Sequence, residues 1–390
     1  MNSPGKLTIL ATIPSGYCFG LQHVTVDFFS RFPPGVKSHF LLTKWGNGEM
    51  EALLKKNGIP YSFSWLGMFS RKMNRLNIKM SIHALLKLPR LYLDFIRLQK
   101  KLQPDILYFA NHHELILLYP VLLFSKRKIV CHMHDPAPVI DFQKKTFKRY
   151  GKLVHHFIAI SESVRMRTMA LGCPPEKIVT IHNGISIPRN INTKRENELA
   201  ALAGWDPGVF IIGITGQMTA TKGHSDLLDA FKQVHRNNPA VRLIIGGKQL
   251  EPLFSELTNA IRESGLEKLV FFTGWLSDVS VFFRNIDVFV LASRHEEGYG
   301  LVVAEAMSYK VPVVITNSGG AVEIVEDGKS GYVVPKAGIA EMAARLQALA
   351  AYAALRTAMG ERARTEIEQN FNINTQTTQL VNCLFKIAGK

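Results

Sequence analysis

The sequence predicts an α/β protein built from two doubly wound units, and three observations support this fold class. Apolar strand-like runs alternate with helical patterns along most of the 390 residues. The alternation stops once, in a polar stretch at 188–197 without apolar periodicity, and then starts again. Hydrophobic residues make up 47% of the chain, which is enough to fill two buried cores. We therefore expect two Rossmann-like domains facing each other across a cleft, with ligands at the carboxyl ends of the strands.

Short apolar runs mark the expected strands of each unit. In the first unit they lie at 7–13, 38–42, 106–109, 128–133, 157–160 and 178–181. In the second unit they lie at 209–215, 241–245, 269–272, 288–291 and 311–315. The expected domains are 1–190 and 205–370. The helical tail is expected to break near 370–372, so that a last helix within 371–390 packs back on the first domain.

The sequence shows neither an export signal nor a disulfide framework. The first residues lead into the strand at 7–13 without the charged-then-apolar pattern of a signal peptide. The longest uncharged apolar run, 115–124, is too short to cross a bilayer and contains Pro120, so we expect a buried helix there. The four cysteines are scattered without CxxC spacing, which predicts neither disulfides nor a zinc site. The expected compartment is a reducing cytoplasm.

The net charge of +16 predicts a polyanionic partner. The excess is concentrated in the first unit, where Arg71, Lys72, Arg75 and Lys79 alternate with large apolar residues. Such interleaving is typical of a surface that lies on anionic lipid. The alternative is a solvated helix face whose apolar side lies in the core. Nucleic acid is not expected as a partner, because no recognisable nucleic-acid-binding motif accompanies the charge.

The segment 296–307 gives the strongest indication of function. It follows the apolar run 286–292, so a strand, a glycine-flanked turn and a helix succeed one another. In this geometry free backbone N–H groups and the helix dipole face an anion such as a phosphate. Glu297 is expected at the mouth of that pocket, and Glu305 about two turns into the helix. A phosphate cradle beside two carboxylates suits a ligand that carries phosphates and hydroxyls, such as a nucleotide sugar.

A second glycine turn lies in the same unit. Gly216 and Gln217 follow the first strand of that unit, and Lys222 stands at the glycine-bounded start of the next helix. A lysine in this position is placed to neutralise a diphosphate as a point charge, the alternative being a solvated lysine beside a tight turn. In the first unit, the loop from Gly16 to Gly20 could offer backbone amides to the same phosphates, although a GxxxG loop alone is a weak signal.

Two histidines end a strand of the first unit. His132 and His134 are separated by one residue, and we expect one of them to face the cleft. A metal site there is the less favoured alternative, because no carboxylate or thiolate is clearly placed beside the pair. The chain also contains no Asp-x-Asp pattern suited to a Mg²⁺–diphosphate complex. We therefore expect a reaction that needs no metal ion.

Several motifs, which follow one another along the chain in the family's order, resemble those of the family-4 retaining glycosyltransferases of the GT-B fold (glycosyl transferases group 1). Residues 297–307 resemble the family's EGFGLxxxEAM signature, and 311–323 resemble its PVV…GG…E continuation. Residues 328–334 resemble the later DGxTGxLV segment. Upstream, 158–164 and 175–185 resemble the VSES and PPEKIxVIHNGI segments. The resemblance covers most of the chain.

The resemblance implies a nucleotide-diphosphate sugar donor, such as a UDP- or GDP-sugar, and a role for each matching residue. Glu297 would bind donor-sugar hydroxyls, Lys222 would stabilise the departing diphosphate, and His134 would approach the donor sugar. Gln217 stands where most relatives carry arginine, so Lys222 is expected to carry more of the neutralisation. The remaining donor-binding residues, which supply backbone amides or hydrogen-bonding side chains, are expected to be Glu305 (on the ribose), Gln217, Gly216, Gly298, Tyr299, Gly300, Leu301 and Gly20.

The resemblance also implies the reaction. It predicts transfer of the sugar, with retention of configuration, to a glycan or lipid-linked acceptor in cell-surface polysaccharide or lipopolysaccharide biosynthesis. Together with the basic first unit, it favours a peripheral location at the inner face of the cell membrane. Two alternatives stay open: a nucleotide-sugar epimerase of the same fold, and a catalytically silent nucleotide-sugar-binding scaffold subunit.

Overall fold

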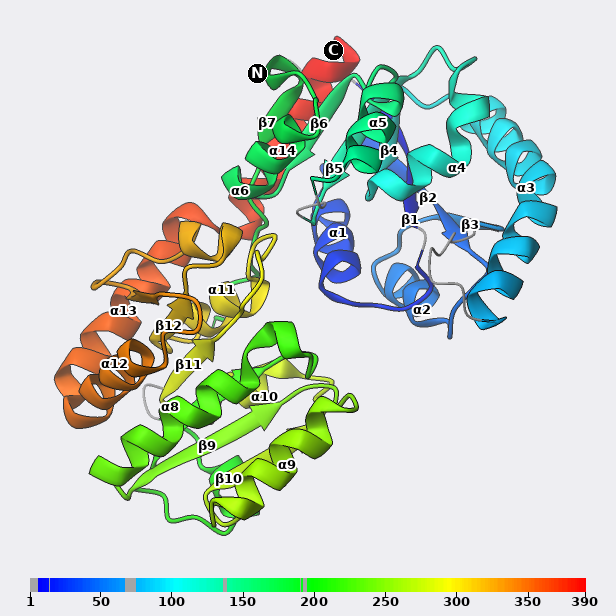
Figure 1. Ribbon diagram of the computed structural model, residues 1–390. Helices are drawn as coiled ribbons and strands as arrows, with labels where there is room; N and C mark the ends of the chain where they lie inside the picture. The colour runs from blue at the N-terminus through cyan, green and yellow to red at the C-terminus, as the bar shows by residue number, and fades with distance from the viewer. Residues whose placement is uncertain (1–5, 14, 67–74, 136–138, 190, 192–194) are drawn as a thin grey trace. The chain divides into compact units, whose positions relative to one another are not determined.

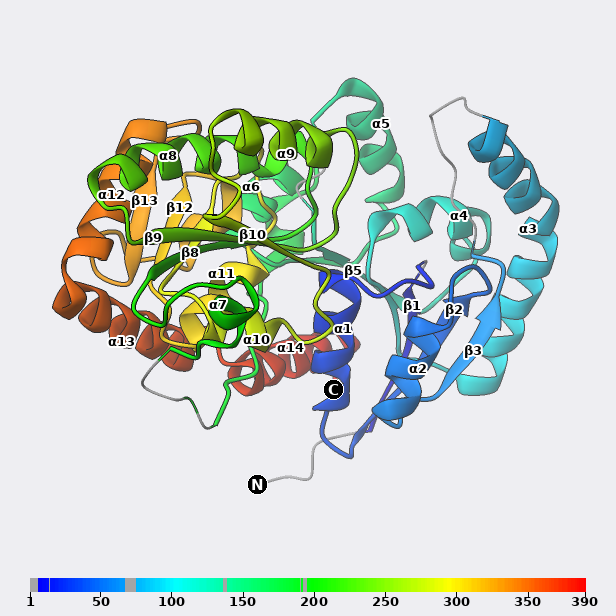
Figure 2. The same cartoon turned by 90° about the horizontal axis from the view of Figure 1, so that it is seen from below.

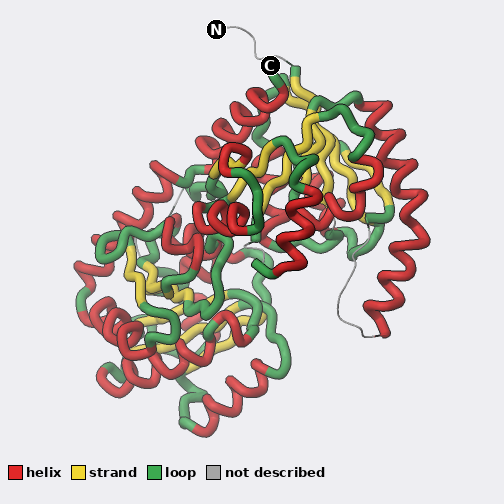
Figure 3. Tube along the Cα trace, turned by 45° about the horizontal axis from the view of Figure 1, so that its top comes forward, coloured by secondary structure: helices red, strands yellow, loops and turns green. Residues whose placement is uncertain are grey.

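The computed structural model describes residues 6–13, 15–66, 75–135, 139–189, 191 and 195–390 of the chain. The chain divides into two compact units (Figure 1). Unit 1 comprises Met1–Gly184 together with Ile373–Lys390, and unit 2 comprises Ile185–Asn372. In each unit the helices surround a core of strands (Figure 3).

Unit 1 is built on a parallel sheet whose seven described strands run in the order β3-β2-β1-β4-β5-β6-β7. Thr12 of β1 pairs with Leu41 of β2 on one side and with Phe109 of β4 on the other. The strands are β1 (Leu7–Ile13), β2 (Val36–Thr43), β3 (Tyr61–Ser64), β4 (Ile106–Phe109), β5 (Lys128–Met133), β6 (His156–Ala159) and β7 (Ile178–Thr180). The α-helices are α1 (Gly20–Ser30), α2 (Glu49–Lys56), α3 (Arg75–Leu102), α4 (His112–Leu122), α5 (Asp141–Tyr150), α6 (Glu162–Ala170) and α14 (Ile373–Ala388).

Unit 2 repeats this arrangement with six described strands in the order β10-β9-β8-β11-β12-β13. Ile212 of β8 pairs with Leu243 of β9 and with Val288 of β11. The strands are β8 (Phe210–Thr215), β9 (Val241–Gly246), β10 (Val270–Gly274), β11 (Val288–Leu291), β12 (Val313–Thr316) and β13 (Gly331–Val334). The α-helices are α7 (Glu198–Leu202), α8 (His224–Asn237), α9 (Leu253–Glu263), α10 (Val279–Arg284), α11 (Leu301–Ser308), α12 (Ile339–Ala351) and α13 (Ala353–Asn370).

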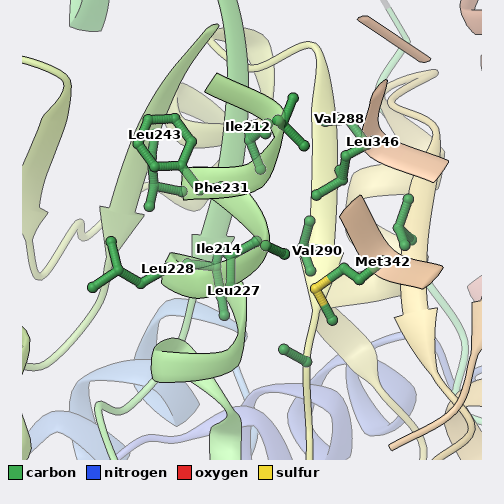
Figure 4. Packing of buried hydrophobic residues seen from close by; sticks show 14 of the residues in the cluster. Ile212, Ile214, Leu227, Leu228, Phe231, Leu243, Val288, Val290, Met342 and Leu346 are labelled. Atoms are coloured by element: carbon green, nitrogen blue, oxygen red, sulfur yellow. The ribbon is translucent and has the colours of Figure 1, made fainter. Parts of the chain in front are cut away.

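The core of unit 2 forms between its sheet and the helices on one face. Figure 2 shows α8 and α9 on one face of the sheet and α10 and α11 on the other. Leu227 and Phe231, four residues apart on α8, are fully buried against the strands (Figure 4). Met342 and Leu346 of α12 repeat this spacing and lie beside the β11 residues in the same cluster (Figure 4). Burial of each such side chain stabilises the unit by about 1.5–3 kcal/mol.

The eleven predicted strands are all present, and their ends differ from the prediction by two residues at most. β3 and β13 were not predicted, because neither is a continuous apolar run: β3 alternates aromatic residues with serines after Pro60, and β13 begins with a glycine. Both are edge strands of their sheets. The helix expected at 115–124 is α4, and the break expected near 370–372 separates α13 from α14. Among the described helices, none combines the length and the apolarity needed to cross a bilayer.

The chain passes between the units twice, and the two crossings lie side by side. Ile185, the first residue of unit 2, donates its N–H to the carbonyl of Phe371 at 2.8 Å and forms a bridge with Asn372. A Cβ on Gly184 would lie 2.4 Å from the Cα of Ile373, so only glycine permits this approach. The returning helix α14 belongs to unit 1, and its residue Leu384 is completely buried.

Replacing Leu227 by alanine should destabilise unit 2, because it removes a fully buried side chain from the face of α8 that covers β8 and β9. We expect a loss of about 2–5 kcal/mol of unfolding free energy, measured by urea denaturation followed by circular dichroism. The control is Leu202→Ala on α7, where the side chain is 69% exposed and the loss should stay below about 0.5 kcal/mol. Equal losses in the two variants would contradict the described core.

Candidate active site

The candidate site lies in unit 2, at the point where the strand order reverses. The chain builds β8, β9 and β10 outward in one direction and then returns to place β11 on the other side of β8. The loops after β8 and β11 therefore leave the same edge of the sheet as neighbours, separated by no intervening strand. In open α/β sheets this switch point is where ligands bind.

The loop after β8 carries Lys222 and is held close to β11 by a glycine. Lys222 ends a short 3₁₀ turn (Ala220–Lys222), and Gly223 follows with a φ of +69°, in the left-handed region. A Cβ on Gly223 would lie 1.9 Å from the carbonyl oxygen of Ala292, just beyond β11. Gly223 is thus required both for its backbone conformation and for the close approach of the two loops.

Lys222 and Glu297 form an ion pair across these two loops. The Lys222 Nζ donates to Glu297 Oε1 at 2.7 Å and to Oε2 at 3.0 Å. The Ser293 hydroxyl donates a further hydrogen bond to Oε1. The Lys222 side chain is 30% exposed and that of Glu297 is 11% exposed, so the pair lies at the boundary between core and solvent. The structure therefore brings together two of the three predicted catalytic residues.

The backbone around Glu297 is fixed by the segment after β12. Gly320 donates its N–H to the carbonyl of Glu297 at 2.9 Å. Gly319 has a φ of +54°, and a Cβ there would lie 2.2 Å from the same carbonyl oxygen. The Thr316 hydroxyl donates to the carbonyl of Ser293 at 2.7 Å. Contacts from a third strand thus support the loop that presents Glu297.

A second ion pair joins the same two loops and was not predicted from the sequence. Arg294 donates from Nε to Asp226 of α8 at 2.7 Å and from a second guanidinium nitrogen to the other carboxylate oxygen. The Asp226 side chain is only 2% exposed. The N–H of Arg294 also donates to the carbonyl of Thr221 at 2.8 Å, directly before Lys222. In the sequence, the position of Arg294 just before the glutamate motif is the one sign of this role. Its partner Asp226 could not be predicted, because the two residues are 68 positions apart.

The helix after the glutamate motif begins later than expected. α11 starts at Leu301, after Gly300 with a φ of +94°, so Glu305 is its fifth residue and lies little more than one turn in, rather than two. By helix geometry, the first N–H groups of α11 have no acceptor within the helix. Tyr299 is 2% exposed and packs edge-on against Phe371, and burial raises the pKa of its hydroxyl well above the usual value. Its ring therefore belongs to the core, and its backbone is the part that a ligand could meet.

The other predicted residues of unit 2 lie on the neighbouring loop. Gly216 follows β8 directly, and a Cβ on Gly247 would lie 2.0 Å from its carbonyl oxygen. Gln217 has an exposed side chain. Gly298 lies between Glu297 and Tyr299 and is half-buried. These residues flank the ion pair along the chain.

A buried histidine follows Lys222 on α8. His224 is 1% exposed, and neither ring nitrogen has a hydrogen-bond partner among the described residues. Burial, with a smaller contribution from the charge of Lys222, lowers the pKa of His224 to about 4. The imidazole next to the ion pair is therefore neutral at physiological pH.

His134 and Gly20 belong to unit 1. The rings of His132 and His134 lie 4.2 Å apart, and both side chains are buried in unit 1. That one of them faces the cleft stays a prediction. The Tyr108 hydroxyl hydrogen-bonds to His132, and burial lowers the pKa of His134 to about 3. Across the described residues, no group of three His, Cys, Asp or Glu is placed to hold a metal ion.

The loop before Gly20 uses two of its amides internally. The N–H of Cys18 donates to the carboxylate of Glu49 at 3.0 Å. The N–H of Phe19 donates to the side-chain oxygen of Gln22 at 3.0 Å. Of the amides that the sequence suggested for phosphate binding, these two are therefore occupied, and Gly20 itself begins α1.

Two family models match the chain and cover both units. The model of glycosyl transferases group 1 matches residues 197–366, and that of glycosyltransferase family 4 matches residues 71–189. The chain belongs to the group 1 glycosyltransferases. The predicted family is thereby confirmed, and the glutamate motif of α11 and the turn of Lys222 both lie within the group 1 match.

The curated relatives of this group 1 chain include glycosyltransferases of bacterial polysaccharide synthesis. It is 30% identical over 227 residues to the capsular polysaccharide biosynthesis glycosyltransferase CapM of Staphylococcus aureus, covering 55% of this chain and 57% of CapM. It is 30% identical over 270 residues to the putative colanic acid biosynthesis glycosyltransferase WcaL of Salmonella typhimurium, covering 67% of this chain and 61% of WcaL. The chain thus spans less than two thirds of the length of either relative.

Solved structures show the same fold at lower identity. The Anabaena protein HepE in complex with UDP superposes with a TM-score of 0.81 and 22% identity, over 98% of this chain and 100% of HepE. The lipopolysaccharide outer core galactosyltransferase WaaB, in its apo form, gives a TM-score of 0.71 and 20% identity, over 98% and 99% of the two chains. These likenesses confirm the predicted fold class, the GT-B type of two Rossmann-like parallel-sheet units.

Lowering the pH should destabilise the group 1 chain in part through His134. Its pKa is about 3 in the folded protein against a usual value of 6.5, so at intermediate pH the unfolded chain binds a proton that the folded chain does not. This contribution to stability is complete above pH 6.5 and is lost as the pH falls towards 3. His134→Gln should therefore lose less unfolding free energy than the wild type between about pH 7 and about pH 5.

The measurement is chemical denaturation at both pH values. The control is His23→Gln, at an exposed position of α1, which should keep the wild-type pH dependence. If His134→Gln lost as much stability on acidification as the wild type, the buried, neutral state of His134 would be refuted.

Proposed function

We propose that this protein is a retaining glycosyltransferase that moves a sugar from a nucleotide-diphosphate donor to a glycan or lipid-linked acceptor. Unit 2 would bind the nucleotide sugar, and unit 1 would bind the acceptor. The observation that carries the proposal is the Lys222–Glu297 pair at the strand switch point, beside the start of α11. This place combines three groups that suit a nucleotide sugar: a cation for the diphosphate, a carboxylate for the hydroxyls and a helix N-terminus for a phosphate.

Lys222 would act on the leaving group. As the bond between sugar and diphosphate breaks, negative charge develops on the diphosphate oxygens, and a fixed ammonium stabilises that charge. Lys222 is held in place by Glu297 and by the turn at Gly223. Gln217 can donate a hydrogen bond but carries no charge, so Lys222 supplies the cationic stabilisation on this loop.

Glu297 would hold the sugar rather than transfer protons. Its carboxylate already accepts hydrogen bonds from the Lys222 ammonium and the Ser293 hydroxyl, which is the kind of contact that a sugar hydroxyl would make. When the diphosphate engages Lys222, the carboxylate oxygens become acceptors for donor-sugar hydroxyls. Glu305, one turn into α11, would bind the ribose, and the amides of residues 298–301 would meet the sugar and diphosphate.

His134 would contribute a neutral hydrogen-bonding group. Its Nε2 is buried and has no hydrogen-bond partner among the described residues. With a pKa of about 3 it carries no charge at neutral pH, so it would hydrogen-bond a sugar hydroxyl without disturbing the charge balance of the diphosphate. Gly20, at the start of α1, would offer its backbone to the same ligand.

The biological setting is proposed from the relatives. CapM and WcaL are described as glycosyltransferases of capsular polysaccharide and colanic acid biosynthesis, and HepE has been solved with UDP and with UDP-glucose. We propose a UDP- or GDP-sugar donor and a role in cell-surface polysaccharide or lipopolysaccharide synthesis at the inner face of the membrane. An epimerase would convert one nucleotide sugar into its epimer with no net release of nucleotide, whereas the proposed transferase releases nucleotide, and only when an acceptor is supplied.

Removing either partner of the ion pair should abolish most transfer. We expect Glu297→Gln and Lys222→Ala each to lower kcat by about 100-fold or more, measured as acceptor-dependent release of nucleotide. The matched controls are Glu263→Gln and Lys268→Ala, at exposed positions of unit 2, which should keep wild-type rates. Full activity of Glu297→Gln would refute the assignment of this site.

Chelation separates the proposed mechanism from a metal-dependent one. Since Lys222 is proposed to supply the stabilising charge, transfer measured with EDTA should equal transfer measured with added Mg²⁺ or Mn²⁺. A loss of rate in EDTA that added metal restores would show that a metal ion, rather than Lys222 alone, neutralises the diphosphate.

A further inference from the structure

Helix α3 of unit 1 presents two opposite apolar faces. One face packs into unit 1 through Ala84, Leu91, Phe95 and Leu98, all of which are buried. These residues follow one another at intervals of seven, four and three, the spacing of a single helix face. This face accounts for the attachment of α3 to the unit.

The other face of α3 carries large apolar side chains into solvent. The exposed members are Ile82, Leu85, Leu86, Leu93 and Ile96, of which Leu86 is 74% exposed. At 3.6 residues per turn they lie opposite the buried face, in a stripe about 100° wide and about 21 Å long. All three ribbon and tube views show α3 as a long helix at the edge of unit 1 (Figures 1, 2 and 3). A contiguous exposed stripe of this kind marks an interaction site.

The residues after α4 extend this stripe. Phe124 is 87% exposed, and it lines a groove of about 540 Å³ together with Ile96 and Lys100 of α3. The Ser125 hydroxyl donates to the side chain of Gln99 at 3.3 Å, which joins the two segments. The outer stripe of α3, the groove and the exposed residues Leu123 and Phe124 thus form one surface, here called the α3 face.

Cations flank the α3 face along one edge and at the end that carries the groove. Residues 81–102 contain five cationic side chains and one acidic one, namely Lys87, Arg90, Arg97, Lys100, Lys101 and Asp94. The single acid, Asp94, is 3.0 Å from Arg90 and is neutralised by it. Lys126 and Arg127 add two further cations at the groove. A chain with a net charge of +16 therefore places a cationic edge, here called the rim, beside an apolar stripe.

We propose that the α3 face lies on the surface of an anionic lipid bilayer. The exposed leucines, isoleucines and Phe124 would enter the boundary of the acyl chains, and the rim cations would meet lipid phosphates. A second copy of the chain is a poorer occupant, because it would bring the same cations against each other. The face differs from the segment 71–80 singled out in the sequence, in which residues 71–74 and the side chains of 75–80 lie outside the described part.

This inference rests on the proposed function in one respect: the α3 face is the surface on which the proposed enzyme would meet a lipid-linked acceptor. Vesicle binding itself requires no catalysis. It is therefore measured by co-sedimentation with vesicles of phosphatidylcholine, with or without phosphatidylglycerol, while acceptor-dependent nucleotide release is measured separately. Vesicle binding without transfer would refute the proposed transferase activity alone. Transfer without vesicle binding would refute the proposed lipid binding of the α3 face alone.

Wild-type protein should bind the vesicles that contain phosphatidylglycerol, and more weakly as salt is raised. Leu86→Gln combined with Leu93→Gln should lower the partition coefficient about tenfold or more. Neutralising Arg97, Lys100 and Lys101 to glutamine should lower it on the order of 100-fold. Since all five positions are exposed or on the rim, the variants should keep the wild-type thermal midpoint.

The controls are Leu202→Gln on α7, a side chain 69% exposed, and Lys268→Gln, which should bind vesicles as the wild type does. Wild-type binding by the double leucine variant would overturn the proposal. So would equal binding to vesicles with and without phosphatidylglycerol. A wild-type dimer in sedimentation velocity that the leucine variant converts to a monomer, with no vesicle binding, would assign the face to self-association instead.

Discussion

The ion pair between Lys222 and Glu297 is the interaction on which the candidate site depends. Its two members are 75 residues apart and meet because β11 returns to pair with β8. The pair also requires a close approach of the two loops, which glycine permits at Gly223, and Gly319 permits the approach of the segment after β12 to Glu297. Fold topology, backbone conformation and charge therefore converge on one contact, and a change in any of them would move the ammonium or the carboxylate.

The Asp226–Arg294 ion pair helps to hold Lys222 and Glu297 in position. Asp226 is nearly inaccessible to solvent, so the free energy cost of burying its charge is offset only while Arg294 stays in contact. Arg294 also donates its N–H to the backbone just before Lys222, so the loop of Glu297 is joined directly to the loop of Lys222. A carboxylate and an ammonium that are positioned in advance lose little entropy when a ligand replaces one of the contacts.

Much of the fold could be predicted from the sequence, because parallel strands buried on both faces are continuous apolar runs. The runs at 7–13, 106–109, 128–133 and 288–291 coincide with β1, β4, β5 and β11. Lys222 and Glu297 could also be singled out from the sequence, because a glycine turn between a strand and a helix indicates each of their loops. Interactions that are settled by tertiary structure were beyond reach: the partner of Arg294, the core position of the Tyr299 ring, and the start of α11, which is set by the left-handed Gly300. The outward apolar stripe of α3 could not be predicted either. A helix with two opposite apolar faces has no simple amphipathic pattern, so the sequence does not show which face is exposed.

The paired crossings at Gly184–Ile185 and Asn372–Ile373 make unit 2 an insertion within unit 1. A ribosome releases the chain from its N-terminal end, so all of unit 2 emerges before α14 does. Every described strand of the unit 2 sheet is available at that moment. Unit 1 still lacks α14, whose Leu384 is buried in its core, and also Lys390, two residues after that helix, which donates to the Asp105 carboxylate at 2.7 Å. During synthesis, the unit whose sequence begins second is therefore the first whose sequence is complete.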